Sequence, residues 1–481
     1  MDKKLSTNNR RAGSVTLLAL LTLALFAALT ALMHAGLSHI GSWGEAAALA
    51  ALYTGAYALA MALYTRLLRP DVRSLIFVGA TAAMLMLARA VMLDFETADY
   101  TAFLSQWTQV FREGGFRTLA ENVGDYNLIY QYILLGISRV PLHDLYLIKW
   151  VTVVFDYLLA LVMMRAGGAL AGEDTQTPLF LIVLALPTVL LDGACWGQCD
   201  PVYITFVVFS LYALETDRPY LSAIALSVAF AFKLQTIFFF PVVLLGLIHK
   251  RYNVRHAVAF FLAYLVTMLP ALLAGRSFMD ALSVYANQSI GQYNDRLTYN
   301  APNLYLFFPM MELGSSQEFT WMRYVAGINE KATNEYLVDW LIPALQSAAL
   351  YACVILTVIA VAYWLIHYRE VTPDMTLELA LFFAIFLPFV MPKIHDRYFF
   401  MADMLSVLYA ARYRNRRFLP VLVIGSSLMS YLPYLTRRRP VDERWLALMM
   451  LAALVLVTRD LLVKMRKNRA ALAIEKGGAS A

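Results

Sequence analysis

Long apolar runs separated by short polar connections make up most of this chain. A helix needs about 20 mostly apolar residues to cross a bilayer, and many of the runs approach or reach that length. The pattern predicts an all-α polytopic membrane protein with about 12–14 transmembrane helices, a range because several runs are short. The predicted helices lie at 14–34, 45–65, 74–93, 145–164, 178–192, 201–214, 219–232, 236–248, 257–274, 341–366, 376–391, 398–411, 418–433 and 445–463.

Two connections between these runs are long, at 94–144 and 275–340. The first contains amphipathic stretches, and the second is rich in Asn, Tyr, Gln and Trp rather than in the Gly and Ser of a flexible linker. We therefore expect a membrane core over 74–411 that carries both loops. Residues 1–73 would add a cytoplasmic tail and two further helices, and 412–481 the last helices and a basic tail.

Lys and Arg are concentrated in every second connection between the predicted helices. Cytoplasmic loops of membrane proteins carry an excess of these residues. The alternate short connections, at 35–44, 193–200, 233–235 and 392–397, contain only Lys233, Lys393 and Arg397. The cationic side should be cytoplasmic, so both termini would lie inside and both long loops on the outer face. Arg437–Arg439 and Arg444 would then lie outside, which means that a late helix is miscounted or that these arginines have an anionic partner.

The composition agrees with a membrane protein, since 60% of the residues are hydrophobic and 15% are charged. Soluble domains are about 45–50% apolar and about 25% charged. The composition therefore excludes soluble domains, a disordered chain and a coiled coil. Three cysteines cannot form a disulfide framework, and the net charge of +6 mainly reflects the topology.

Ionisable, polar and aromatic residues gather in the connections of the predicted outer face, and ionisable residues near the membrane are more often functional than those on a soluble surface. Folding would bring them together from distant parts of the chain. They are Asp94, Asp99, Asp125, Tyr126, Trp196, Gln198, Asp200, Lys233, Lys393, His395 and Arg397.

Such a cleft suits transfer chemistry on an anionic, lipid-borne substrate. A carboxylate can accept the proton of an attacking hydroxyl, and cations can stabilise a phosphate leaving group. Arg would bind the phosphate with its planar fork, and Lys would act as a point charge. No metal-ligand spacing and no glycine-rich phosphate loop occurs, so we expect neither a metal nor another cofactor.

Each feature also has a purely structural interpretation. Asp99 could cap a helix, and Asp125 with Tyr126 could form a turn. Lys233 could extend to the lipid headgroups, as Lys near helix ends commonly does. His395 and Arg397 could belong to an interfacial salt-bridge cluster. The common side of the membrane favours the functional interpretation.

At these residues the sequence resembles the GT-C superfamily of integral-membrane glycosyltransferases, which use polyprenyl-phosphate sugars. It is most similar to bacterial mannosyltransferases related to the GPI-anchor mannosyltransferases, and to the dolichyl-phosphate-glucose-dependent glucosyltransferases of the endoplasmic reticulum. The stretches that carry the resemblance are Ala98–Trp107, Asp125-Tyr126-Asn127 with Tyr130, Trp196–Asp200, Ala231–Gln235 with Pro241, and Lys393–Phe400.

The resemblance implies a GT-C fold and an inverting transfer of one hexose, mannose or glucose, to an outer-face acceptor such as a lipid-linked glycan or cell-envelope glycoconjugate. Asp99 would be the general base, with Asp94 as its rival. Asp125, Tyr126, Trp196, Gln198 and Asp200 would position the acceptor or the sugar. The donor phosphate would be held by His395, Arg397 and Lys233, with Lys393 as a helper.

The chain departs from the simplest family pattern, because the loop with Asp99 follows the third predicted helix rather than the first. Because two helices are added, the loop with Asp99 stays on the same side of the membrane as in the family pattern. The active site would face outward from the plasma membrane of a bacterium, or lie in the endoplasmic reticulum membrane of a eukaryote.

Two other functions stay open. A transporter or flippase for a lipid-linked saccharide would place polar sites near the middle of the bilayer. Arg89, Lys149 and Asp156 lie within predicted helices, and Arg89 and Asp156 keep this alternative open, although the one-sided distribution of the other charges favours an interfacial enzyme. A structural assembly subunit without catalysis would make Asp99 and His395 individually dispensable.

Overall fold

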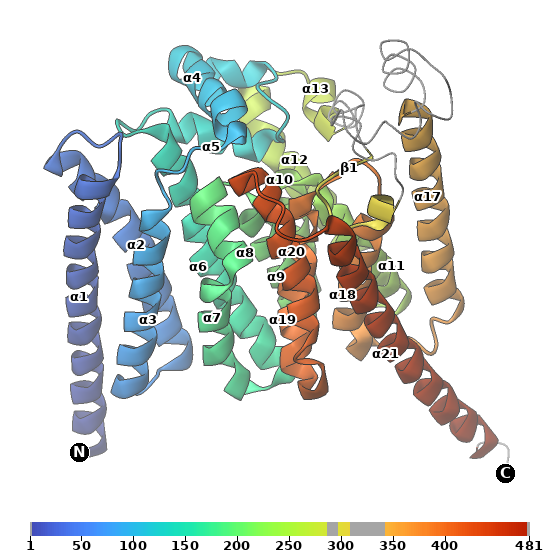
Figure 1. Cartoon of the computed structure of the whole chain (residues 1–481). Helices are drawn as coiled ribbons and strands as arrows, with labels where there is room; N and C mark the ends of the chain where they lie inside the picture. Colours follow the sequence, from blue (N-terminus) through green and yellow to red (C-terminus); the bar gives the residue numbers. More distant parts are fainter. Residues whose placement is uncertain (1, 286–296, 308–341, 479–481) are drawn as a thin grey trace. The chain divides into compact units, whose positions relative to one another are not determined.

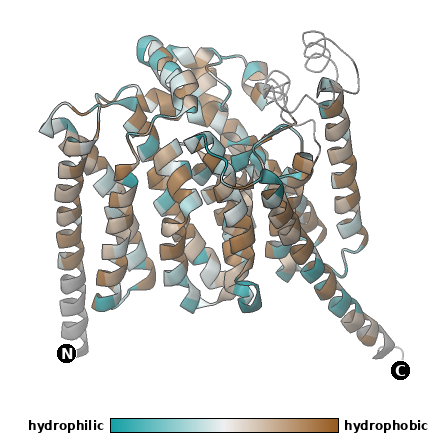
Figure 2. Cartoon of the chain, in the orientation of Figure 1, coloured by the Kyte–Doolittle hydropathy of each residue, from teal (hydrophilic) through white to brown (hydrophobic). Residues whose placement is uncertain are grey.

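The computed structural model describes residues 2–285, 297–307 and 342–478. Each of the fourteen predicted apolar runs overlaps a helix, and the described strands form a single pair of two residues each. The all-α polytopic fold is therefore confirmed. Figure 2 shows hydrophobic residues along the helices and hydrophilic residues at many of their ends and connections, as a bilayer requires.

Nine helices of the described residues are long and apolar enough to cross a membrane. A tenth span results if Glu173–Ala185 and Pro187–Trp196, which are bent by 48° at the break, are counted together. The predicted number is higher because it includes four shorter helices. These are α9 (Asp200–Glu215), α10 (Pro219–Phe232), α11 (Phe240–Ile248) and α19 (Phe400–Arg412).

The chain divides into two compact units. The first comprises Met1–Leu234 and Val258–Tyr285. The predicted boundaries at residues 73 and 411 separate groups of predicted helices along the sequence rather than compact units, and they stay a prediction. The further helices of the first unit are α1 (Asp2–Gly36), α2 (Trp43–Leu68), α3 (Val72–Val91), η1 (Tyr100–Leu104), α4 (Ser105–Gly114), η2 (Gly115–Ala120), α5 (Leu128–Ile137), α6 (Asp144–Ala171), η3 (Glu173–Thr175), α7 (Gln176–Ala185), α8 (Pro187–Leu190), η4 (Leu191–Trp196), most of α12 (Val254–Leu273), and α13 (Phe278–Leu282).

Helix α6 is central to the first unit, because α2, α7, α9 and η4 all pack against it. Figure 1 shows α1, α2, α3, α6 and α7 running alongside one another. Hydrogen bonds join the start of α6 to the connection that follows α1 and to the loop that follows α3. These connections therefore lie at one end of the unit, as the charge pattern predicts.

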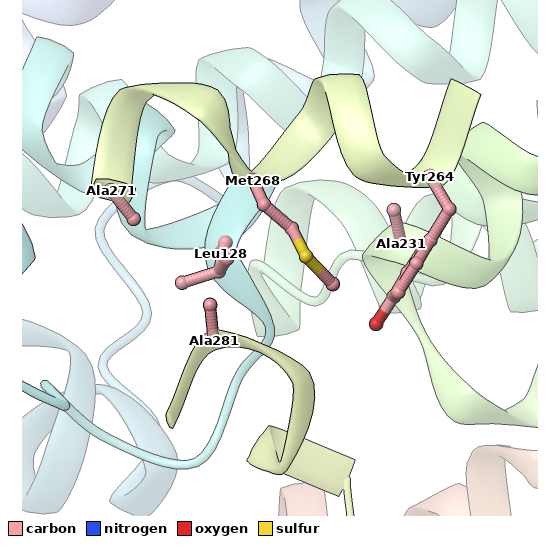
Figure 3. Packing of buried hydrophobic residues seen from close by; sticks show 6 residues of the cluster. All are labelled: Leu128, Ala231, Tyr264, Met268, Ala271 and Ala281. Carbon is pink, nitrogen blue, oxygen red and sulfur yellow. The ribbon is translucent and has the colours of Figure 1, made fainter. Parts of the chain in front are cut away.

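The long loop between α3 and α6 is anchored by an apolar cluster. Leu128 of α5 packs with Ala231 of α10, with Tyr264, Met268 and Ala271 of α12, and with Ala281 of α13 (Figure 3). Burying apolar side chains contributes about 25 cal/mol per Å². The cluster fixes α5 and hence the turn of Asp125 and Tyr126 that directly precedes it.

The second unit comprises Gln235–Ala257 and Ala286–Ala481. Strand β1 (Thr298–Tyr299), from the second long loop, pairs in parallel with β2 (Ile394–His395). Residues 286–296 and 308–341 of this loop lie outside the described residues. The other elements are η5 (Leu234–Phe239), η6 (Leu304–Phe307), α17 (Ile342–Ile366), η8 (Pro373–Met375), α18 (Thr376–Val390), η9 (Asp396–Phe399), η10 (Arg414–Arg416), α20 (Leu419–Thr436) and α21 (Glu443–Gly478).

Candidate functional site

Asp99 is the centre of a hydrogen-bonded group in the first unit. The indole Nε1–H of Trp196 donates to Asp99 Oδ2 at 3.0 Å, and the Gln198 amide Nε2 donates to the same oxygen at 2.8 Å. The Tyr126 hydroxyl donates to Gln198 Oε1 at 3.1 Å. Four of the predicted site residues, from three separate segments, are therefore brought together.

Both segments that meet at Asp99 contain a π-helical turn. Asp99 directly precedes η1, and Trp196 ends η4. Gly197 follows with φ of +76°, a left-handed conformation that glycine adopts without steric cost. The reversal at Gly197 directs Trp196 and Gln198 toward the same carboxylate. Single π-turns are rare and occur frequently at functional sites.

Aromatic rings extend the site from Tyr126. The Tyr126 ring lies 4.4 Å from Tyr130 and meets Trp107 edge-on at 5.9 Å between centroids. Gly124, with φ of +72°, lies so close to Trp107 that an added Cβ would be 2.4 Å from its Cε2 atom. A glycine is therefore required beneath the indole ring. Asp125 is half-buried in the same turn.

Asp94 is held by different donors from those of Asp99. Its Oδ1 accepts hydrogen bonds from the Ser38 backbone N–H and hydroxyl, both at 2.9 Å, and from the Tyr146 hydroxyl at 2.7 Å. Partial burial acts to raise the Asp94 pKa, but the hydrogen bonds from Tyr146 and Ser38 outweigh it and lower the pKa. Asp94 thereby ties the loop after α3 to the connection after α1.

Asp200 and Lys233 form a buried ion pair that we did not predict. Lys233 Nζ lies 2.7 and 2.8 Å from the two Asp200 carboxylate oxygens. Asp200 begins α9 and Lys233 follows α10, and these helices pack as a hairpin with a short connection. Their similar lengths already imply that the two residues lie opposite each other, so the sequence contained the signal.

In the second unit, the β1–β2 pair positions His395. The His395 ring stacks on Tyr299 at 4.8 Å with an interplanar angle of 17°. Lys393 has φ of +59°, and its backbone N–H donates to the Leu297 carbonyl at 2.8 Å. Burial lowers the pKa of the Lys393 ammonium. Sequence reasoning missed Tyr299, because nothing local marks the pairing of its segment with β2.

Arg397 lies in η9, two residues after His395. Its side chain is buried, and its backbone N–H donates to Asp396 Oδ1 at 2.9 Å. Lys393, His395 and Arg397 therefore come from one short segment of the second unit. The Asp99 group belongs to the first unit, and the meeting of these two sets stays a prediction.

Two of the charges within the helices of the first unit, Arg89 and Asp156, neutralise each other. Arg89 of α3 donates from Nε to Asp156 Oδ2 of α6 at 2.8 Å, and both side chains are fully buried. A buried charge is costly unless it is paired. The pairing explains both residues without a transported substrate. Across the described ranges, no three His, Cys, Asp or Glu side chains are grouped as metal ligands.

Comparison with known proteins identifies one family. The model of glycosyltransferase family 87 matches residues 132–392. The match includes Trp196, Gln198, Asp200 and Lys233, whereas Asp99 precedes it and His395 follows it. No curated protein matches the chain. Since the matched range covers 261 of 481 residues, the chain belongs to glycosyltransferase family 87 and is a multi-pass membrane glycosyltransferase.

Proposed function

We propose that the protein transfers a single hexose from a polyprenyl-phosphate sugar to an acceptor hydroxyl, with inversion and with Asp99 as general base. The observation that carries the proposal is the Asp99 carboxylate held by Trp196 and Gln198. Two N–H donors on one oxygen fix the plane of the carboxylate. A general base must be held in such a geometry to accept a proton in the transition state.

The reaction is a single displacement. The acceptor oxygen forms a bond to the anomeric carbon of the hexose as the bond from that carbon to the phosphate oxygen breaks. The hydroxyl proton passes to Asp99, and the bonding electrons leave with the polyprenyl phosphate. One displacement inverts the anomeric configuration. No further oxidant, reductant or co-reactant is needed.

Asp94 is the alternative base, and its contacts favour Asp99. The hydrogen bonds from Ser38 and Tyr146 suit Asp94 to holding the loop in place. Tyr126, Gln198 and Trp196 adjoin Asp99, so we assign them to positioning the acceptor or the sugar, with Asp125 in the same turn.

His395 and Arg397 are the residues that we assign to the donor phosphate, with Lys393 beside them. Two cationic side chains and an imidazole on one short segment can neutralise charge on a leaving phosphate. For Lys233, the ion pair with Asp200 favours holding the turn at Trp196–Asp200 over the predicted phosphate contact. The charge pattern favours an outer-face site and hence a lipid-linked glycan or envelope glycoconjugate as acceptor.

The test is a transfer assay on the full chain in nanodiscs. Radiolabelled polyprenyl-phosphate mannose, polyprenyl-phosphate glucose and the matching nucleotide sugars are each supplied with a lipid-linked glycan extract. We expect transfer from one lipid-linked donor and none from the nucleotide sugars. His395→Ala and Arg397→Ala should each raise the KM for the donor.

Transfer from a nucleotide sugar alone would overturn the proposed donor. Saturable binding of the lipid-linked saccharide and its flipping across liposomes, without turnover, would instead indicate the transporter.

A further inference from the structure

Lys149 is a buried cation in α6 that the proposed chemistry does not use. Its side chain is 1% exposed. The ammonium donates three hydrogen bonds to backbone carbonyls, those of Met92 at 3.2 Å, Leu93 at 2.9 Å and Phe95 at 2.7 Å. Each of the three N–H bonds of the ammonium therefore has a carbonyl acceptor, which is what a buried ammonium requires.

These carbonyls lie where α3 ends and the loop to Asp99 begins. The last carbonyls of a helix lack partners within the helix, and a cation is favourable there. Tyr146, one turn before Lys149 on the same face of α6, bonds to Asp94. Together the two side chains bond to four consecutive residues of the loop, from Met92 to Phe95.

Lys149 also contacts the other segment of the site. An added Cβ at Gly197 would lie 3.3 Å from Lys149 Cγ, so the Gly197 backbone packs directly on the lysine stem. Gly197 separates Trp196 from Gln198, the two residues that bond to Asp99. One side chain thus supports both the loop that carries Asp99 and the turn that carries its partners.

We propose that Lys149 is a positioning residue that holds Asp99 against Trp196 and Gln198. The inference rests on the proposed function for its kinetic consequence, but the position of the loop can be measured independently. A displacement of about 1 Å in a catalytic group can lower the rate on the order of 100-fold. Loss of Lys149 should therefore affect turnover more than donor binding.

The test uses Lys149→Met, which keeps the length of the stem and removes the three donors. Lys149→Arg keeps a cation that can donate to the carbonyls. The matched control is Trp150→Phe, since Trp150 is the next residue of α6 and its Nε1–H donates to the Leu52 carbonyl of α2 at 2.9 Å. This control removes one hydrogen bond of the same helix to a different element.

Loop position is read from a nitroxide on Ala98→Cys in the full chain in nanodiscs. Ala98 is exposed beside Asp99, whereas Cys195, Cys199 and Cys353 are buried. We expect greater label mobility in Lys149→Met than in the Lys149 parent. The kcat for transfer should fall on the order of 100-fold, with the donor KM within about two-fold. Lys149→Arg should restore much of the parental kcat and of the parental label mobility. Trp150→Phe should match the parent in kcat and in label mobility.

Parental label mobility and kcat in Lys149→Met would overturn the inference, as would an equal loss of kcat in Trp150→Phe. If Lys149→Met does not fold, Lys149→Arg decides: it should fold with parental label mobility, and increased mobility would overturn the inference. Greater mobility in Lys149→Met, with no transfer by the parent from any lipid-linked donor, would support the positioning of the loop and overturn the proposed function.

Discussion

The buried pair of Lys233 and Asp200 leads to a quantitative prediction that separates two roles for the lysine. Lys233→Met preserves the apolar stem and leaves the Asp200 carboxylate without its cation, while Asp200→Leu leaves the cation alone. Removing one partner of a buried ion pair costs about 3–5 kcal/mol, because the remaining charge is uncompensated. Replacing both partners with apolar residues is often close to neutral.

The position of Asp200 refines these magnitudes. Asp200 begins α9, where the helix dipole stabilises a carboxylate by about 0.3–1 kcal/mol. The lone carboxylate in Lys233→Met therefore keeps some compensation, and we expect a cost near 3 kcal/mol, the lower end of the range. Lys233 caps the C-terminal end of α10, where the helix dipole favours a cation, and its ammonium lies 5.7 Å from the centroid of the Tyr203 ring. The lone ammonium in Asp200→Leu is therefore also partly compensated, and its cost should likewise be about 3 kcal/mol.

The assay is a double-mutant cycle on the free energy of unfolding in mixed micelles, combined with the donor dissociation constant of each variant. The double variant should lose far less stability than the sum of the two single variants. If Lys233→Met instead leaves stability unchanged and weakens donor binding ten-fold or more, the ion pair is not what holds Lys233. Its predicted contact with the donor phosphate would then be supported.

Three further predictions concern other parts of the chain. Gly124→Ala should destabilise the protein by about 2–4 kcal/mol, from the left-handed backbone and the displacement of Trp107, as measured by unfolding and Trp fluorescence. Burial, together with the nearby His39, lowers the His143 pKa below its usual 6.5. The unfolded chain therefore binds this proton more readily, so the apparent unfolding temperature should fall as the pH drops below 6.5, and His143→Phe should reduce that dependence. EDTA should leave transfer unchanged; a loss that a divalent cation restores would contradict metal-free chemistry.

The helices and their shared polar end could be predicted from the sequence, because the length of an apolar run and the placement of Lys and Arg are local properties. The same reasoning placed Asp99, Tyr126, Trp196 and Gln198 on one side of the membrane. It could not show that two of these side chains bond directly to Asp99. That geometry depends on two π-turns and the left-handed Gly197, which have no periodic signal.

Contacts between residues that are distant in the sequence also could not be predicted. The stacking of Tyr299 on His395 results from a two-residue strand pair, which is too short to produce a visible alternation of polar and apolar positions. Lys149 stood out in the sequence only as a charge within a helix. Its actual partners are backbone carbonyls, and these leave no trace in residue identity.

The most direct test of the central claim is the turnover of Asp99→Asn compared with its donor affinity. An asparagine keeps a side-chain oxygen that can accept from Trp196 and Gln198, but it cannot take up the acceptor proton. Loss of a general base lowers the rate about 10²–10⁴-fold. We predict a decrease of kcat in that range with an unchanged donor dissociation constant, while Asp94→Asn keeps most of its turnover. Retention of most of kcat by Asp99→Asn, or its loss in Asp94→Asn alone, would contradict the assignment of Asp99 as the base.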